Sequence, residues 1–458
     1  MSESKPNNTG EAQNSPSSGL VLKLIFFTLF IDLIGFSIIF PLFPGMLDYY
    51  HATEGDSGLF GLMYAGLAGF SSWGGNDGGE WRIIVLFGGV LAALYSLLQF
   101  VFAPFFGMLS DRVGRKPVLV FCLSGILLSY ALWFFAGGFL LLVIARFIGG
   151  MMSANISTAT AVVADVTAQK ERSRGMAIIG IAFGLGFIIG PAIGGISATW
   201  DLTAQWPGLA AYGVNPYSMP AAVAFLLTLA NVFLVCFKLP ETRALAGEDG
   251  VHVRRTVNPA ALFQKEAYPG VSRTNLANFL FIFAFAGMEF SLTFLAVDRL
   301  GFSHMQNAYM FIFVGVVMAL VQGGYVRRKA DKIGPKKMTM QGFLVMIPAL
   351  ALVGAAGQWQ SVGLLYLGLF LLALGSALAT PCLASLVSLY SPAEEQGRIS
   401  GGVRSMGALG RAGGRLVGCV VYWRLGAATA YYLGALSIIL PLLIAGTLPK
   451  PGSDAPAA

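Results

Sequence analysis

The sequence predicts an all-α polytopic membrane protein with twelve transmembrane helices in two pseudo-symmetric six-helix bundles. Only 11% of its 458 residues are charged and 56% are hydrophobic, whereas soluble proteins carry about 25% charged residues. Many apolar runs reach the roughly 20 residues that a helix needs to cross a bilayer. Backbone groups in lipid must hydrogen-bond within the chain, which favours helices. Motifs that recur at half-chain separation predict a duplicated bundle.

Pro/Gly breaks and charged turns divide the apolar body of the chain into spans. The twelve predicted spans are residues 21–43, 83–106, 117–137, 139–166, 175–197, 220–239, 273–297, 305–326, 338–357, 361–389, 397–423 and 427–448. They give a first bundle at 20–239 and a second at 273–449, joined by a polar cytoplasmic loop at 240–272. Residues 1–19, rich in Ser, Asn and Pro, are predicted to form a disordered cytoplasmic tail, and residues 450–458 a second tail.

The placement of Lys and Arg predicts the orientation in the membrane. Most of the 29 basic residues fall in the first tail, the central loop and the connections after every second span. Because such residues stay on the cytoplasmic side, both termini are predicted to be cytoplasmic. The insert at 44–82 is poor in basic residues and then faces the outside or a lumen. The net charge of +7 follows from this bias, and we expect no nucleic-acid partner.

Two pairs of motifs carry the duplication. Residues 107–116, GMLSDRVGRK, form a tight charged hairpin between the second and third spans, and residues 331–336, DKIGPK, repeat its DRVGRK spacing. Three glycines of the fifth span recur in the eleventh; they are Gly186, Gly190 and Gly194, and then Gly410, Gly414 and Gly418. Two independent repeats at nearly equal separation favour duplication over coincidence.

Charged side chains inside the predicted spans are the first candidates for function, because an intramembrane charge is costly unless it is paired or wet. Arg411 and Arg415 stand one turn apart on one helix face, which suits an anionic substrate. The alternative is that one of them snorkels to an interface, and Arg411 is predicted to lie deeper. Asp32 and Glu289 are the opposing acids. Glu289, in mid-span among apolar residues, suits reversible protonation or substrate binding.

The fifth span contains a glycine and proline motif, residues 186–195, GFIIGPAIGG. Its motif residues are Gly186, Gly190, Pro191, Gly194 and Gly195. Glycines at this spacing form a groove for close helix contact, and the proline bends the helix. The proline and the second glycine pair make the motif more specific than a bare GxxxG.

Taken together, the hairpin at 107–116, the RxxxG spacing of Arg146 and Gly150, and the fifth-span motif resemble the major facilitator superfamily of transporters and its drug:proton antiporter branch. Further segments resemble the animal tetracycline transporter-like family; they are PLFPG at 41–45, LFGG at 86–89, RFIGG at 146–150, VAD at 163–165, EFSL at 289–292, YVRR at 325–328 and GALGRA at 407–412. The resemblance runs from about residue 21 to 449. In one departure, Arg415 stands where the family pattern GRAxGP has proline, which puts a bend of the eleventh helix in doubt.

The resemblance implies roles for the charged residues. The hairpin residues would latch the two halves at the cytoplasmic side; they are Gly107, Asp111, Arg112, Gly114, Arg115 and Lys116, with Asp331 in the repeat. The alternative is a topological anchor. Asp165, at the cytoplasmic end of the fourth span, is expected to pair with Arg115. In this fold the first and fourth helices line the central cavity, so Asp32 and Arg146 are the expected coupling pair, with a purely structural ion pair as the alternative.

These features favour a secondary transporter that moves organic anions or amphiphilic drug-like molecules by proton-coupled antiport, with alternating access. Asp32, Arg146, Glu289 and Arg411 would surround the substrate. An uncoupled facilitative carrier, and a non-transporting receptor or scaffold that uses the 44–82 insert, are the alternatives. We expect a monomer in the plasma membrane, with the small-molecule substrate, protons and bilayer lipid as partners.

Several other classes of function are not expected. The sequence has no P-loop, nucleophile elbow or His/Cys cluster, so we expect no enzyme, ATP drive, cofactor or metal. The four cysteines lie in predicted spans without a CxxC neighbour and are expected to be small buried residues; they are Cys122, Cys236, Cys382 and Cys419.

Overall fold

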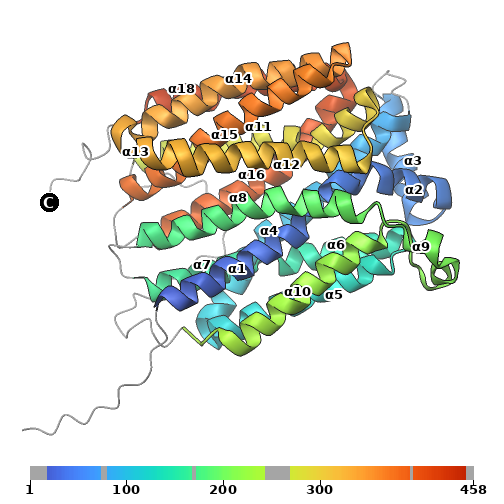
Figure 1. The fold of residues 1–458 in the computed structure, drawn as a ribbon, viewed down its shortest axis with the longest axis horizontal. Helices are drawn as coiled ribbons and strands as arrows, with labels where there is room; N and C mark the ends of the chain where they lie inside the picture. Colours follow the sequence, from blue (N-terminus) through green and yellow to red (C-terminus); the bar gives the residue numbers. More distant parts are fainter. Residues whose placement is uncertain (1–17, 74–79, 168–171, 243–268, 392–395, 450–458) are drawn as a thin grey trace, which may run out of the picture.

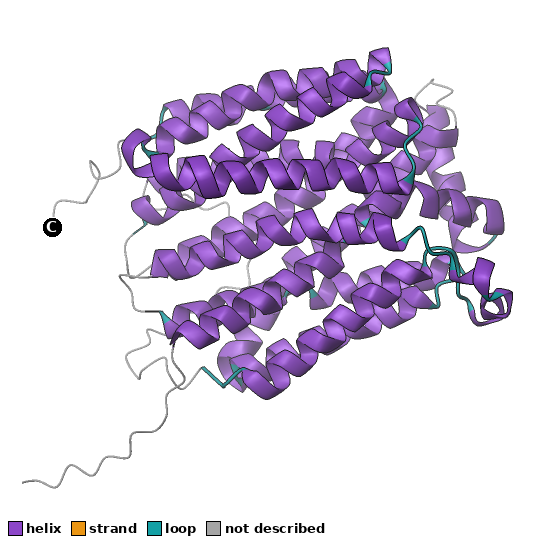
Figure 2. Cartoon of the chain, viewed as in Figure 1, coloured by secondary structure: helices purple, strands orange, loops and turns teal. Residues whose placement is uncertain are grey.

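Helices make up the regular structure of the described chain. The computed structural model describes residues 18–73, 80–167, 172–242, 269–391 and 396–449. Within these ranges it contains helices and no strand (Figure 2). A helix, or a pair of consecutive helices, occupies each of the twelve predicted spans, so the predicted fold class is confirmed. Most of the predicted central loop, residues 243–268, and the predicted tails at 1–17 and 450–458 lie outside the described residues.

The first six spans precede the central loop. They are α1 (Ser18–Ser37), which continues through a 3-10 turn (Phe40–Leu42) into α2 (Phe43–Glu54), then α4 (Glu80–Val113), α5 (Arg115–Phe134), the pair α6 (Phe139–Met152) and α7 (Asn155–Val166), α8 (Arg172–Ser197) and α10 (Ser218–Lys238). The insert predicted at 44–82 is largely helical, because α2 and α3 (Gly58–Trp73) occupy it. A short helix, α9 (Leu202–Gln205), and a 3-10 turn (Pro207–Tyr212) connect α8 to α10.

The last six spans follow the central loop. They are α11 (Pro269–Leu300), α12 (His304–Leu320), which passes through a π-helical turn (Val321–Val326) into α13 (Arg327–Ile333), α14 (Pro335–Trp359), α15 (Val362–Tyr390), α16 (Gln396–Leu425), and the pair α17 (Ala427–Ser437) and α18 (Ile439–Gly446). Glycines with positive φ separate equivalent helices in the two repeats: Gly114 (φ +119°) precedes α5 and Gly334 (φ +87°) precedes α14. These angles require the glycine that both repeats carry.

The eleventh span differs from the others in composition. Eleven helices or helix pairs of the described chain are long and apolar enough to cross a membrane, and α16 is not among them. The cause is a set of five arginines; they are Arg398, Arg404, Arg411, Arg415 and Arg424. Because α16 packs along α4 on one side and α11 on the other, protein rather than lipid surrounds much of it, which is the setting in which intramembrane charges are tolerated.

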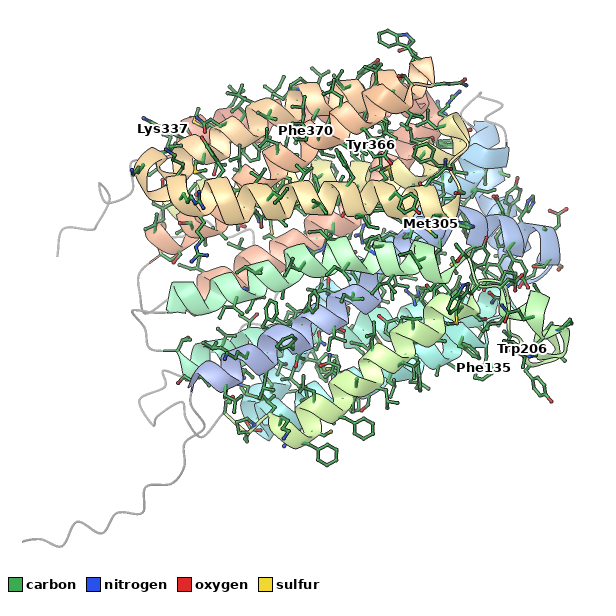
Figure 3. All side chains as sticks on the ribbon, viewed as in Figure 1. Phe135, Trp206, Met305, Lys337, Tyr366 and Phe370 are labelled. Atoms are coloured by element: carbon green, nitrogen blue, oxygen red, sulfur yellow. The ribbon has the colours of Figure 1, made fainter. Side chains whose placement is uncertain are left out.

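The long helices run side by side along one axis (Figure 1). The start of α1 and the end of α18 lie at the same, left-hand end of that view, and α2, α3 and α9 lie at the opposite end. Large apolar side chains such as Phe370 are exposed on the outside of the bundle, with Lys337 near the left-hand end and Trp206 near the right-hand end (Figure 3). Phe233 of α10 is exposed as well. This surface is the one a bilayer would cover.

Helix packing follows the same plan in both repeats. α1 packs on α8 as α11 packs on α16, and α5 packs on α6 and α10 as α14 packs on α15 and α17. Two pairs, α4 with α16 and α8 with α12, join helices from the two predicted bundles. The domain boundaries themselves, at 20–239 and 273–449, stay a prediction.

Candidate functional site

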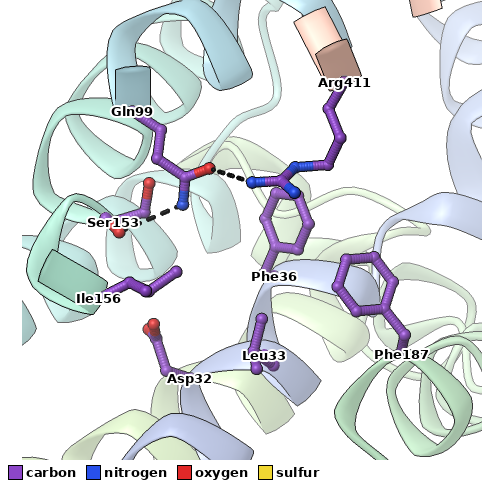
Figure 4. A pocket seen from close by; sticks show the side chains of 8 residues that line it. All are labelled: Asp32, Leu33, Phe36, Gln99, Ser153, Ile156, Phe187 and Arg411. Atoms are coloured by element: carbon purple, nitrogen blue, oxygen red, sulfur yellow. Dashed lines mark hydrogen bonds between the residues drawn. The ribbon is translucent and has the colours of Figure 1, made fainter. Parts of the chain in front are cut away.

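A cavity lies among helices of both predicted bundles (Figure 4). Its lining residues are Asp32, Leu33, Phe36, Gln99, Ser153, Ile156, Phe187 and Arg411. The first helix supplies Asp32 and Phe36, α4 supplies Gln99, and α16 supplies Arg411. One acid, one cation and two aromatic rings therefore line a small cavity together with two neutral polar and two aliphatic side chains.

Asp32 is held by a neutral partner. Its side chain is 5% exposed, and Asn155, the first residue of α7, donates from Nδ2 to Asp32 Oδ2 over 3.2 Å. Asn155 reaches α1 because α6 ends at Met152 and the chain restarts as α7, so its amide stands at the level of Asp32. Asp32 therefore lines the cavity with a neutral amide, rather than a cation, as its hydrogen-bond partner.

Arg146 does not form the ion pair with Asp32 that the sequence led us to expect. It is 4% exposed and lies over the ring of Trp133, with its guanidinium carbon 4.9 Å from the ring centroid. The reason is position along the chain: Asn155, which does contact Asp32, lies nine residues beyond Arg146 and on the other side of the break between α6 and α7. Arg146 is also absent from the lining of the cavity.

Arg411 reaches from α16 to α4. Its Nη2 donates to Gln99 Oε1 over 3.3 Å, and Gln99 Nε2 in turn donates to the carbonyl of Ser153 over 3.3 Å (Figure 4). Gln99 thus presents its side-chain oxygen to Arg411 and its side-chain nitrogen to the break between α6 and α7. The arginine is half-buried, so a cation stands in the cavity with a neutral partner rather than a carboxylate.

Arg415 is more buried than Arg411, although Arg411 was predicted to lie deeper in the membrane, and it does not reach a wet surface. It is 1% exposed, its Nη1 donates to Ser96 Oγ over 2.9 Å, and its guanidinium carbon lies 5.8 Å and 5.2 Å from the ring centroids of Phe36 and Phe40. The residue replaces the expected proline, and α16 continues through it as one helix. The snorkelling alternative is therefore wrong for Arg415.

Glu289 stands beside these arginines without bonding to them. It lies in α11, is half-buried, and interacts electrostatically with both Arg411 and Arg415. No hydrogen bond or ion pair within 4 Å joins Glu289 to either arginine among the described residues. The acid does not line the cavity either, so of the four predicted substrate residues the cavity brings together Asp32 and Arg411.

The fifth-span motif packs α8 against two helices. A Cβ added at Gly190 would lie 1.9 Å from Ser37 Oγ, and one added at Gly194 would lie 2.0 Å from the carbonyl oxygen of Ile38. Ser37 Oγ also donates to the Gly186 carbonyl over 3.0 Å. These contacts hold α8 directly on α1.

The other face of the motif meets the second predicted bundle. A Cβ added at Gly195 would lie 2.5 Å from Ala308 Cβ of α12, and Pro191 is buried inside the continuous helix α8. The repeat glycines behave in the same way on α11: a Cβ added at Gly414 would lie 2.0 Å from the Phe283 carbonyl oxygen, and one added at Gly418 would lie 2.7 Å from Gly287 Cα. Each motif therefore fits a close helix contact, as its spacing predicts.

The hairpin residues form a polar cluster at the ends of α4, α5 and α7. Arg115 pairs with Asp165, as expected, with 2.9 Å between Nε and Oδ2, and its Nη1 donates to Asp111 and, over 2.8 Å, to Ser110 Oγ. Glu241 accepts from the backbone N–H of Arg115 over 2.9 Å, which caps the start of α5. Asp111, Ser110 and Asp165 belong to the first predicted bundle, and Glu241 lies at the start of the predicted central loop.

The remaining latch candidates are less informative. Arg112 is exposed, Gly107 lies inside α4, and the backbone N–H of Lys116 donates to Glu241 over 3.1 Å. Asp331 lies in α13, but its side chain is outside the described residues. A latch between the two halves stays a proposal.

Arg115→Gln is expected to lower the free energy of unfolding by about 3 kcal/mol, because Arg115 and Asp165 are both largely buried and the change leaves the Asp165 carboxylate without its cationic partner. The measurement is thermal unfolding of the purified protein in detergent. Lys238→Gln, which removes an exposed cation at the end of α10, is the control and should stay within about 0.5 kcal/mol of the parent protein. Equal stability of the two variants would reduce the cluster to a surface feature.

Sequence reasoning missed several polar residues that join the helices. Ser96, Gln99, Asn155 and Thr160 are buried or line the cavity, and Arg404 of α16 donates to Thr160 Oγ1 of α7. The available signal was the presence of Gln99 and Asn155 inside strongly apolar runs. All four cysteines are free thiols, with Cys236 half-buried and the other three buried.

The fold, with two similarly packed sets of helices long and apolar enough to cross a membrane, defines a polytopic membrane protein. The chain belongs to the Major Facilitator Superfamily, whose family model matches residues 25–415 and, in a second match, 323–457. The chain is accordingly an integral membrane protein that transports small molecules.

The chain is similar over most of its length to curated transport and resistance proteins. The chain is 35% identical to mouse major facilitator superfamily domain-containing protein 10 over 453 residues, covering 94% of this chain and 93% of that protein. It is 34% identical to the human protein of the same name, covering 95% and 94%. The class B tetracycline resistance protein of Escherichia coli is 26% identical, covering 86% of each chain.

Solved structures agree with this placement. The crystal structure of the human organic anion transporter MFSD10 (TETRAN) matches with a TM-score of 0.73 and 33% identity, covering 94% of this chain and 100% of that one. The D-xylose–proton symporter matches with a TM-score of 0.68 at 16% identity, covering 95% and 98%. At that identity, the second structure supports the fold alone.

Proposed function

We propose that this transporter moves organic anions or amphiphilic drug-like molecules in exchange for protons. The observation that carries the proposal is the cavity in which Asp32 of α1 and Arg411 of α16 meet. Arg411 supplies the positive charge that attracts an anion, and Asp32 supplies a carboxyl group for the proton. Phe36 and Phe187 supply apolar contact for the body of the substrate.

The relatives support the substrate class. One relative is described as a human organic anion transporter, and others are bacterial tetracycline resistance proteins. Proton exchange is supported by the neutral partner of Asp32, because Asn155 does not hold the carboxyl group in an ion pair that would fix its charge. We further propose a monomer in the plasma membrane, surrounded by bilayer lipid, with both termini cytoplasmic.

The two predicted bundles would rock about this cavity to open it to each side in turn. The contacts that must separate include the bond between Arg411 and Gln99 and the packing of Gly195 against Ala308. In the conformation in which these contacts have separated, Asp111, Arg115 and Asp165 would latch the cytoplasmic ends of the two bundles together.

Flux through the purified protein in proteoliposomes tests this function. The liposomes carry a pH gradient and are offered naphthalenesulfonate as an anion, naphthyltrimethylammonium as a cation and naphthalenesulfonamide as a neutral compound. Uptake of naphthalenesulfonate that follows the gradient is the expected result. Uptake that ignores the gradient would instead support a facilitative carrier, and no uptake of any compound would favour a receptor.

Arg411→Gln is expected to lower the affinity for naphthalenesulfonate about ten- to hundredfold, because a hydrogen-bonded charge contributes about 1.5–3 kcal/mol. Binding of the neutral naphthalenesulfonamide should change little. Competition with a fluorescent anion on the purified protein measures both. An equal loss for the anion and the neutral compound would mean that Arg411 acts through packing instead.

A further inference from the structure

Arg415 carries a hydrogen-bonding edge that nothing in the described protein fills. Its Nη1 is bonded to Ser96, but its Nε and Nη2 are buried and have no hydrogen-bond partner among the described residues. Nε and Nη2 together form the side edge of the guanidinium group, which donates two parallel hydrogen bonds to an oxyanion. A buried cation whose side edge is unfilled is costly unless something else occupies it.

The position of this edge relates it to the cavity. Arg415 lies one turn from Arg411 on the same face of α16, about 6 Å along the axis. Arg411 donates to Gln99 and Arg415 donates to Ser96. The two arginines therefore make equivalent hydrogen bonds from α16 to α4. Phe36 links the two places, because its ring lines the cavity and also lies 5.8 Å from the Arg415 guanidinium carbon.

We propose, building on the organic-anion transport proposed above, that Arg411 and Arg415 form a two-point site for organic dianions, in which Arg415 binds the second oxyanion through its Nε and Nη2 edge. A turn of the Phe36 side chain opens the path from the cavity to this edge.

Among the residues that the structure describes, Glu289 is the acid that interacts electrostatically with both arginines. It could fill the same edge if its side chain moved. The Glu289 carboxylate and a bound dianion, as alternative partners of Arg415, predict different results for Glu289→Gln. If Glu289 were the partner of Arg415, Glu289→Gln would leave the buried arginine without its counter-charge and lower the stability of the fold. If a dianion is the partner, Glu289→Gln keeps or strengthens dianion binding.

The test compares naphthalenedisulfonate, with a sulfonate at each end of the ring system, with naphthalenesulfonate, which has one. Binding is measured on the purified full-length protein in detergent by calorimetry, which requires no transport. The parent protein should bind the disulfonate at least about tenfold more tightly. Arg415→Gln should remove this preference by weakening the disulfonate alone. Arg415→Lys, which keeps the charge without the fork, should retain part of it.

Control variants separate the site from general effects. Arg424→Gln, at the exposed end of α16, should leave the ratio of the two affinities unchanged, and Arg411→Gln should weaken both probes. An unchanged ratio in Arg415→Gln, an equal loss for both probes, or no binding of the disulfonate to the parent protein would overturn the two-point site. Naphthalenesulfonate flux in proteoliposomes tests the proposed function separately. Flux without tighter binding of the disulfonate would overturn only the second binding point at Arg415. Tighter binding of the disulfonate without flux would overturn only the proposed transport.

Discussion

Asp32→Asn is expected to reduce flux driven by a pH gradient to the level of liposomes without protein, while exchange of labelled for unlabelled substrate continues. Asparagine keeps the size and polarity of the side chain but cannot take up or release a proton. The interaction with Asn155 can be kept by a turn of either amide group, so the fold should survive. The loss therefore falls on coupling rather than on binding.

The measurement is naphthalenesulfonate uptake in proteoliposomes with and without the gradient, together with exchange at equal pH on both sides. Asp56→Asn, in the exposed connection between α2 and α3, is the matched control and should behave as the parent protein. Gradient-driven flux of normal size in Asp32→Asn would remove Asp32 from the coupling mechanism. Loss of both flux and exchange would assign the residue to substrate binding or folding.

Gly194→Ala is expected to destabilise the protein by at least about 1–3 kcal/mol, the usual cost of overpacking. The new Cβ would stand 2.0 Å from the carbonyl oxygen of Ile38, and a backbone atom cannot turn aside as a side-chain end can. α8 must then move away from α1, which also strains the hydrogen bond from Ser37 to Gly186. The apparent melting temperature in detergent should fall by several degrees.

Gly184→Ala provides the control within the same helix. A Cβ at Gly184 would meet nothing within 4 Å, and alanine favours helix over glycine by about 1 kcal/mol, so this variant should be as stable as the parent protein or slightly more stable. In the second repeat, Gly418→Ala would place its Cβ 2.7 Å from Gly287 Cα and should resemble Gly194→Ala. Equal melting temperatures for Gly184→Ala and Gly194→Ala would mean that α1 and α8 are not closely packed.

The two glycine motifs also explain how the cavity is positioned. α1 carries Asp32 and Phe36 and is held on α8, while α16 carries Arg411 and Arg415 and is held on α11. Each repeat thus presents one helix with functional side chains, backed by close contact with a partner. Because these contacts are between backbones, each pair is expected to move as a unit when the bundles rock.

Much of the architecture follows from local sequence. The twelve spans and the duplicated hairpin are visible because bilayer thickness sets the length of an apolar run and because the repeats keep Gly114 and Gly334 at turns with positive φ. The pairing of Arg115 with Asp165 was also predictable, since both are charged residues at the same ends of neighbouring spans.

The partners of the intramembrane charges were decided only by the tertiary structure. Asp32 was expected to meet Arg146, but it meets Asn155, because the break between α6 and α7 and the depth of each residue determine which side chains face each other. Arg415 was expected to lie nearer a surface than Arg411, but α4 and the rings of Phe36 and Phe40 enclose it. Composition and periodicity determine that a helix spans the membrane. The rotation and depth of each helix against its neighbours, which arise from packing between distant segments, determine which charges meet.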